Sequence, residues 1–142
     1  MGRRGSERRG QASGPRRVKG VTFDAGGLIA LDRNDRRVVV LIARAHEQNL
    51  RITVPATALA QAIRRPRTQV RLARLIRQTT TNLVPLDGAH ATAVGLLLAA
   101  SRTTDITDAH VVICAREEGH PIVTSDPDDL HRLNPDVTLV VV

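Results

Sequence analysis

Short apolar segments alternate with helical segments along most of this 142-residue chain. The apolar runs predict strands at 21–23, 51–54, 82–86, 121–124 and 137–142. Strands that alternate with helices are typical of a parallel sheet covered by helices on both sides. The chain is also too short for two ordinary domains. The sequence therefore predicts an α/β fold, a three-layer α/β/α domain with a parallel central sheet, at 20–142.

The predicted helices differ in how much of their surface should be apolar. They are expected at 36–49, from Pro55 to an interruption at Pro66, at 67–79, at 88–101 and at 111–117. The segment 88–101 is rich in Ala and Leu, so we expect it to be buried on much of its circumference. The helix at 111–117 contains Cys114 in an apolar run, which predicts a core position.

The composition excludes several classes of protein. Phe23 is the only aromatic residue, so base stacking on aromatic platforms is excluded as a way to bind single strands. The sequence has no phosphate-cradling glycine loop and no dinucleotide fingerprint. A single cysteine cannot form an intramolecular disulfide, and no apolar stretch approaches the roughly 20 residues that span a bilayer. We therefore expect a soluble, cytoplasmic protein with no membrane partner.

The positive charge is concentrated at one end of the chain. Residues 1–19 contain seven basic residues and one acid, so they account for +6 of the formal net charge of +7. With Gly, Ser and Pro between the arginines, this tail is expected to be disordered. Two interpretations of it stay open: an unstructured leader, and a segment that contacts nucleic-acid phosphates.

Three aspartates stand next to patterned segments that are far apart in the sequence. Asp24 and Asp126 each follow a predicted strand, and Asp108 precedes the apolar helix at 111–117. Ligands of open α/β sheets bind beyond the carboxyl ends of the strands, so Asp24 is well placed. Gathered carboxylates repel one another and raise one another's pKa unless a cation intervenes. Mg²⁺ or Mn²⁺, which prefers oxygen ligands, is the expected cofactor.

Each acid also has an ordinary structural role open to it. Asp24 is suited to cap the helix that follows it, and Asp105 with Asp108 three residues later is close to a capping box. Asp126 before Pro127 is a usual helix start. For Asp126 the two roles are compatible, because one carboxylate oxygen can cap the helix while the other faces a metal ion.

The order and spacing of four segments resemble those of the PIN domain, and especially of VapC-type toxins of type II toxin–antitoxin systems. The segments are the strand that ends in Asp24 with residues 28–30 after it, residues 54–56, residues 107–110 before an apolar helix that ends at Gly119, and residues 123–130. The resemblance covers about 21–142. It implies a Mg²⁺- or Mn²⁺-dependent ribonuclease, a hydrolase of phosphodiester bonds, that forms a homodimer and is neutralised by a cognate antitoxin protein.

The resemblance also assigns roles to individual residues. Asp24, Asp108 and Asp126 match the acids that hold the metal and carry catalysis. Asp105 and Asp129 are expected to support them. Thr124 and Ser125 are expected either to orient water or phosphate or to form local turn bonds.

Gln61 departs from the family pattern, because most members carry an acid there. An amide oxygen can still coordinate a hard cation, but it supplies no charge, so divalent binding should be weaker. A one-metal nuclease, a weak nuclease and a pseudo-enzyme all stay open, as does a misalignment of this helix. No Asp or Glu occurs between Glu47 and Asp87, so the segment itself lacks the acid.

Two further sets of residues carry weaker signals. Arginines recur at helical spacing and are expected either to contact RNA or an acidic antitoxin segment, or to form a solvated face; they are Arg64, Arg67, Arg71, Arg74 and Arg77. The five histidines show no shared metal spacing, and His110 points some 200° away from Asp108 around an ideal helix. His110 is therefore interpreted as structural or peripheral.

Two functions of different classes follow from these observations. The first is a metal-dependent endoribonuclease of the toxin type, with Gln61 as a neutral supporting group. The second is a non-catalytic PIN-like module that binds RNA or a protein through its arginine-rich surface.

Overall fold

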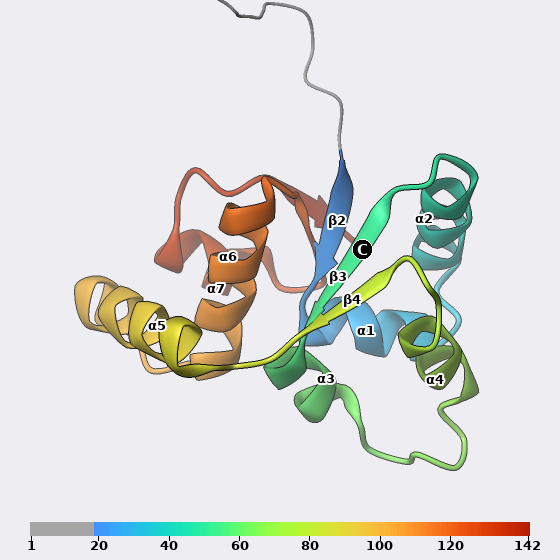
Figure 1. Cartoon of the computed structure of the whole chain (residues 1–142), viewed down its shortest axis with the longest axis horizontal. Helices are drawn as coiled ribbons and strands as arrows, with labels where there is room; N and C mark the ends of the chain where they lie inside the picture. The colour runs from blue at the N-terminus through green and yellow to red at the C-terminus, as the bar shows by residue number, and fades with distance from the viewer. Residues whose placement is uncertain (1–18) are drawn as a thin grey trace, which may run out of the picture.

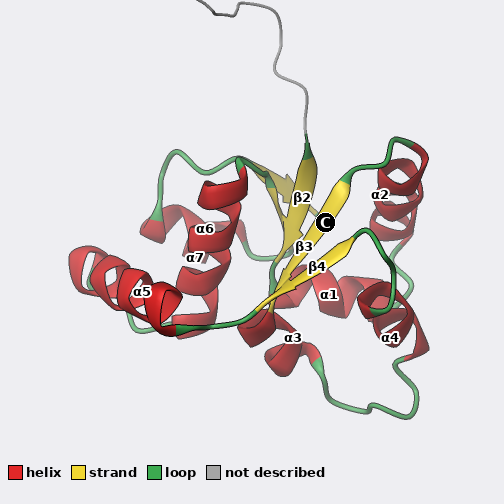
Figure 2. Ribbon diagram, in the orientation of Figure 1, coloured by secondary structure: helices red, strands yellow, loops and turns green. Residues whose placement is uncertain are grey.

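The computed structural model of the chain describes residues 19–142. The predicted disordered tail at 1–19 lies outside the described residues except for Lys19. Within the described part, five parallel strands form one sheet in the order β4-β3-β2-β5-β6. Figure 2 shows β4, β3 and β2 side by side. The strands are β2 (Gly20–Phe23), β3 (Arg51–Pro55), β4 (Thr81–Val84), β5 (Ile122–Thr124) and β6 (Leu139–Val141). The predicted α/β class and parallel sheet are confirmed.

Helices cover the two sides of this sheet. They are α1 (Ala25–Asp32), α2 (Arg36–Glu47), α3 (Ala56–Ala62), α4 (Val70–Ile76), α5 (Gly88–Ser101), α6 (Ile106–Glu118) and α7 (Pro127–Leu133). In Figure 1, α1, α2 and α4 lie to one side of the strands and α5, α6 and α7 to the other. Parallel strands must be joined by a crossover, usually a helix that packs on one face of the sheet. This requirement explains both the alternation of strands and helices in the sequence and the three layers of the fold.

The core is centred on the middle strand and on α6. All four residues of β2 are buried, and α6 has seven consecutive buried residues from Ala109 to Ala115. Phe23, the only aromatic side chain, is fully buried. Each fully buried aliphatic or aromatic side chain stabilises the fold by about 1.5–3 kcal/mol, so β2, which precedes Asp24, and α6, which carries Asp108, are both firmly anchored in the core.

The expectation that the helix at 88–101 is buried on much of its surface is wrong. Val94 is the buried residue of α5, whereas Leu96 is 69% exposed. The reason is the place of α5 in the fold: it packs against α6 and α7 rather than on the sheet (Figure 1). A helix at the outside of a layer has one covered stripe, however apolar its remaining residues are.

Two helix boundaries also differ from the prediction. The helix expected at 67–79 is reduced to α4 at Val70–Ile76, and Arg64 and Arg67 lie in the loop before it. The arginine series therefore does not share one helix face. In the other case, α6 begins at Ile106 rather than 111, so that Asp108 lies in its first turn.

Gln69 explains why the loop between α3 and α4 holds its shape. Its side-chain oxygen accepts hydrogen bonds from the backbone N–H groups of Arg64 and Arg65, at 2.9 and 3.1 Å, and its amide donates to the Ala62 carbonyl at 2.9 Å. These bonds replace the helical hydrogen bonds that the segment around Pro66 cannot make. The sequence interpretation gave Gln69 no role.

Candidate active site

Asp24 stands directly after β2, at the carboxyl end of the central strand. Its backbone N–H donates to the Val123 carbonyl of β5 at 3.1 Å, which continues the ladder past the last paired residue. Its side chain accepts from the Gly27 N–H at 2.7 Å, and so caps α1. The capping role considered from the sequence is thus realised. Since Asp24 is buried, with only 4% of the residue exposed, its side chain is held in a fixed orientation.

Two glycines allow α1 to begin so close to β5. A Cβ at Gly26 would collide with the Ser125 hydroxyl, and a Cβ at Gly27 would collide with the Val123 carbonyl. Any larger residue would force the start of α1 away from the loop after β5. The glycine pair therefore brings Asp24 up to that loop.

The loop after β5 is organised by Thr124. This residue is fully buried, and its hydroxyl accepts a hydrogen bond from the Asp126 N–H at 2.9 Å. Hydrogen bonding from the same hydroxyl opposes the rise in the pKa of Asp24 that burial causes. Ser125 and Asp126 are exposed. Thr124 thus connects two of the three candidate metal ligands.

Asp126 occupies the N-cap position of α7, but its side chain makes no capping hydrogen bond. The sequence interpretation allowed one oxygen to cap the helix, and the structure does not bear out that part. Burial raises the pKa of the Asp126 carboxyl, and hydrogen bonding with Asp129 and its negative charge raise it further.

Asp105 and Asp108 mark the start of α6. The Asp108 N–H donates to the Asp105 carboxylate at 2.9 Å, so Asp105 is the N-cap that the sequence suggested. Both acids line a cavity of about 210 Å³ together with Asp129 and Arg132 of α7. Arg132 forms an ion pair with Asp129 at 2.8 Å. The sequence interpretation missed Arg132; the i,i+3 spacing of the pair was the only available signal.

The acids interact strongly through their charges. Burial, which is the largest cause, and the negative charges of four other aspartates together raise the pKa of the Asp108 carboxyl to about 7. In order of effect those neighbours are Asp105, Asp24, Asp129 and Asp126. Burial is the largest cause of a raised pKa at Asp24, and the charge of Asp126 adds to it. Hydrogen bonds from Thr124 and Gly27 oppose this rise. Folding has therefore gathered acids from β2, α6 and α7 into one field of negative charge.

The donor set fits a hard divalent cation in kind, because every ligand atom it offers is a carboxylate or hydroxyl oxygen. Burial first, and then the charges of neighbouring acids, raise the pKa values of Asp24, Asp108 and Asp126, and a cation bound beside them would oppose that rise. Within residues 19–142, however, no three of these acids offer oxygens that all lie within 4.8 Å of one another. Binding of an ion would therefore have to draw the side chains together.

Gln61 is exposed near the end of α3, and among the described residues no hydrogen bond joins its side chain to an acid. Its backbone position does follow β3, the strand next to β2, and α3 packs against both α1 and α6. The element that carries Gln61 is thus next to the two helices that carry Asp24 and Asp108 at their first turns.

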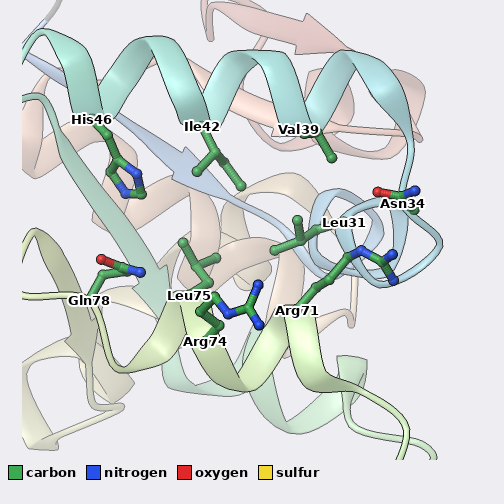
Figure 3. Close-up of a pocket in the computed structure, with 9 residues that line it drawn as sticks. All are labelled: Leu31, Asn34, Val39, Ile42, His46, Arg71, Arg74, Leu75 and Gln78. Atoms are coloured by element: carbon green, nitrogen blue, oxygen red, sulfur yellow. The ribbon is translucent and has the colours of Figure 1, made fainter.

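A separate groove lies between α2 and α4 (Figure 3). It has a volume of about 200 Å³, and its lining includes the apolar side chains of Leu31, Ile42 and Leu75. In Figure 3, Arg71 and Arg74 rise from α4 beside these apolar groups. Of the five arginines considered for RNA or partner binding, Arg71 and Arg74 therefore line a groove, whereas Arg64, Arg67 and Arg77 do not.

Two histidines that the sequence interpretation treated as unrelated meet between α5 and α6. His90 Nδ1 and His110 Nε2 lie 3.0 Å apart, with the rings edge to face. His110 is buried in α6, where it also bonds Thr57 of α3 at 2.8 Å. Burial and the neighbouring His90 lower the pKa of His110, which favours the neutral ring.

Comparisons with known proteins support the fold. No protein-family model and no curated protein matches the sequence. Among solved structures, the chain is similar to the crystal structure of FitAcB from Neisseria gonorrhoeae, with a TM-score of 0.53 and 14% identity over 84% of this chain and 95% of that one. The likeness shows a PIN-like α/β fold. Within residues 19–142, no helix has both the length and the apolar character needed to cross a membrane.

Proposed function

We propose that this chain is a metal-dependent endoribonuclease that acts as the toxin of a toxin–antitoxin pair. The observation that carries the proposal is the environment of Asp108: its carboxyl lines a cavity, and its pKa is raised to about 7 by burial and by four other acids. An arrangement that costs the fold stability is expected where function requires it. The PIN-like fold and the resemblance to VapC-type toxins indicate which function that is.

Asp24, Asp108 and Asp126 would hold Mg²⁺ or Mn²⁺, and Asp105 and Asp129 would support them. The bound ion would supply an activated water and stabilise the charge that develops on the phosphate. Asp24 is oriented by the Gly27 N–H, and Thr124 links it to the Asp126 backbone. These bonds fix the orientation of Asp24, whereas Asp126 is exposed to solvent.

Arg132 adds a positive group to the cavity lined by Asp105, Asp108 and Asp129, which we call the acid cavity. Its guanidinium bonds Asp129 at 2.8 Å and is otherwise largely exposed. A guanidinium at this position is suited to contact a phosphate oxygen of RNA, since arginine donates in a geometry that matches phosphate. We assign Arg132 the role of orienting the RNA backbone at the cavity.

The groove between α2 and α4 is proposed to take the partner protein. Its apolar residues and its two arginines suit an amphipathic segment that carries acidic side chains. This surface would bind the antitoxin, and the acid cavity would bind RNA. A homodimer remains an expectation from the family resemblance.

The decisive experiment compares RNA cleavage by the wild type and by Asp108→Asn, with Mn²⁺, with Mg²⁺ and with a chelator. Total cellular RNA serves as substrate, so that no cleavage site need be guessed. We expect metal-dependent cleavage by the wild type and at least about a 100-fold lower rate for the variant, which loses a charged ligand. Asp136→Asn is the matched control, because the Asp136 side chain makes no hydrogen bond within residues 19–142, and its backbone N–H donates to Asn134.

The alternative is a non-catalytic PIN-like module, and the neutral, exposed Gln61 favours it. Under that hypothesis Asp108→Asn leaves RNA or protein binding intact, whereas Arg71→Glu with Arg74→Glu abolishes it. Folded wild-type protein that binds RNA but cleaves none of it with Mn²⁺ would decide for this alternative.

A further inference from the structure

His90, His110 and Cys114 form a compact cluster that the proposed nuclease does not use. Each offers one ligand atom, and the three atoms all lie within 4.8 Å of one another. His110 and Cys114 are one helical turn apart on α6, so their side chains share a face, and His90 reaches them from α5. Within the described residues, no other group of His, Cys, Asp and Glu meets this distance criterion.

The outer nitrogen of each imidazole is already held by an oxygen. His110 Nδ1 bonds the Thr57 hydroxyl at 2.8 Å, and His90 Nε2 bonds the Glu117 carboxylate at 2.8 Å. This leaves His110 Nε2 and His90 Nδ1 facing each other, 3.0 Å apart, beside the Cys114 thiol. Metal-binding histidines in proteins almost always have such an oxygen partner on the second nitrogen, because it fixes the tautomer and the ring orientation.

We propose that His90, His110 and Cys114 bind one Zn²⁺ ion. Two imidazoles and a thiolate suit this borderline-soft cation, whereas the oxygen-only acid cavity suits Mg²⁺ or Mn²⁺. A cavity of about 230 Å³, lined by His90, Cys114 and Glu117, adjoins the cluster. Water from this cavity completes a tetrahedral set.

Binding requires two changes of protonation. The proton between the facing nitrogens moves to His110 Nδ1, where it is donated to the Thr57 oxygen, and the Thr57 hydroxyl turns its own hydrogen away. The Cys114 thiol loses its proton to solvent as its sulfur bonds the metal. One proton therefore leaves for each Zn²⁺ bound, and no oxidation or reduction takes place.

Through its ligands, a bound ion would join α5 to α6, which otherwise contact each other only along the covered side of α5. The ion would tie α5 to α6, and through Thr57 to α3. His110 and Cys114 share α6 with Asp108, but His110 points some 200° away from Asp108 around the helix, and neither β2 nor α7 contributes a ligand, so this site is separate from the acid cavity. It does not depend on nuclease activity.

The test is a titration of the full chain with Co²⁺, followed by displacement with Zn²⁺. Cobalt bound by thiolate shows a sulfur-to-metal charge-transfer absorption, and tetrahedral cobalt shows intense visible bands. We expect both signals at one equivalent in the wild type and equally in Asp108→Asn, which disables the acid cavity. Zn²⁺ should abolish them.

Variants of the cluster must remove the signal without unfolding the protein. Cys114→Ser should abolish the charge-transfer band, and His90→Gln, at the less buried ligand, should weaken Co²⁺ binding by at least about tenfold. His131→Gln, an exposed histidine of α7, is the matched control and should change nothing. Circular dichroism establishes that each protein is folded. A folded wild type without the charge-transfer band, or a band that survives in Cys114→Ser, overturns the proposal.

Discussion

The acid cavity and the histidine–cysteine cluster differ in how well their polar groups are stabilised by their neighbours. Burial and the charges of four other acids raise the pKa of Asp108, so its ionised form is disfavoured. His90 and His110, in contrast, form a continuous chain of hydrogen bonds from Thr57 to Glu117. The acid cavity would be stabilised by added positive charge, whereas the polar groups of the histidine cluster already have hydrogen-bond partners. Gathering like charges is costly, and gathering neutral polar groups that bond one another is not.

The largest effect is expected from neutralising the buried acid of the first region. Asp24→Asn should lower metal-dependent RNA cleavage at least about 100-fold, because the orienting Gly27 bond remains while the charged ligand is lost. Initial cleavage rates with Mn²⁺ measure this. Asp32→Asn, an acid at the other end of α1, serves as the control. Equal rates for Asp24→Asn and wild type would remove Asp24 from the site.

The next effect concerns the satisfied region. Thr57→Val removes the oxygen partner of His110 Nδ1 and leaves a nitrogen of a buried ring without a bond. Unfolding in urea should show a loss of about 1–2 kcal/mol. Thr92→Val is the matched control, because the Thr92 hydroxyl donates to the Gly88 carbonyl of its own helix at an exposed position. An unchanged urea midpoint for Thr57→Val would show that the hydrogen bonds from Thr57 to Glu117 do not contribute to stability.

A smaller effect is expected in the pH dependence of stability without divalent ions. The folded-state pKa of Asp108 is about 7 against an ordinary 3.8, so the folded protein holds a proton that the unfolded chain has released. Stability therefore falls as the pH rises from about 4 to about 7 and is level above that. The loss should be on the order of 1 kcal/mol, since this group is partly exposed to solvent screening.

The histidine cluster contributes to the same profile with the opposite sign. The pKa of His110 is lowered in the fold, so protonation favours the unfolded chain and stability rises with pH toward the ordinary value of 6.5. An Asn side chain does not ionise, so in Asp108→Asn the fall of stability with rising pH should be shallower than in the wild type. Melting temperatures from pH 4 to pH 8 test this, and a slope that Asp108→Asn leaves unchanged would contradict the assignment.

The smallest effect is expected at Gln61. Gln61→Glu restores the acid that the family resemblance implies and should tighten Mn²⁺ binding by about threefold to tenfold, as expected for one added charge in a solvent-accessible site. Calorimetric titration measures the change. Gln48→Glu, at the C-cap of α2, adds the same charge elsewhere and should have no effect. Equal affinities for the two variants would place Gln61 away from the ion.

Parts of the site were predictable because they depend on local sequence. Asp24 after an apolar strand and Asp105 before an apolar helix take the positions that the pattern predicted, and both cap the helices they precede. Arg132 was missed because its relevance depends on the cavity between α6 and α7. The histidine pair could not be predicted from spacing along the chain, because His90 and His110 come from different helices.

The sequence by itself determined the α/β class, the parallel sheet and the positions of the acids, because periodicity, capping and strand ends are set by near neighbours. Tertiary structure decided the rest. It left α5 largely exposed despite its apolar composition, shortened the arginine-bearing helix and joined His90 to His110 and Cys114. These outcomes depend on which elements pack against one another, and that choice minimises the free energy of the whole chain rather than of any one segment.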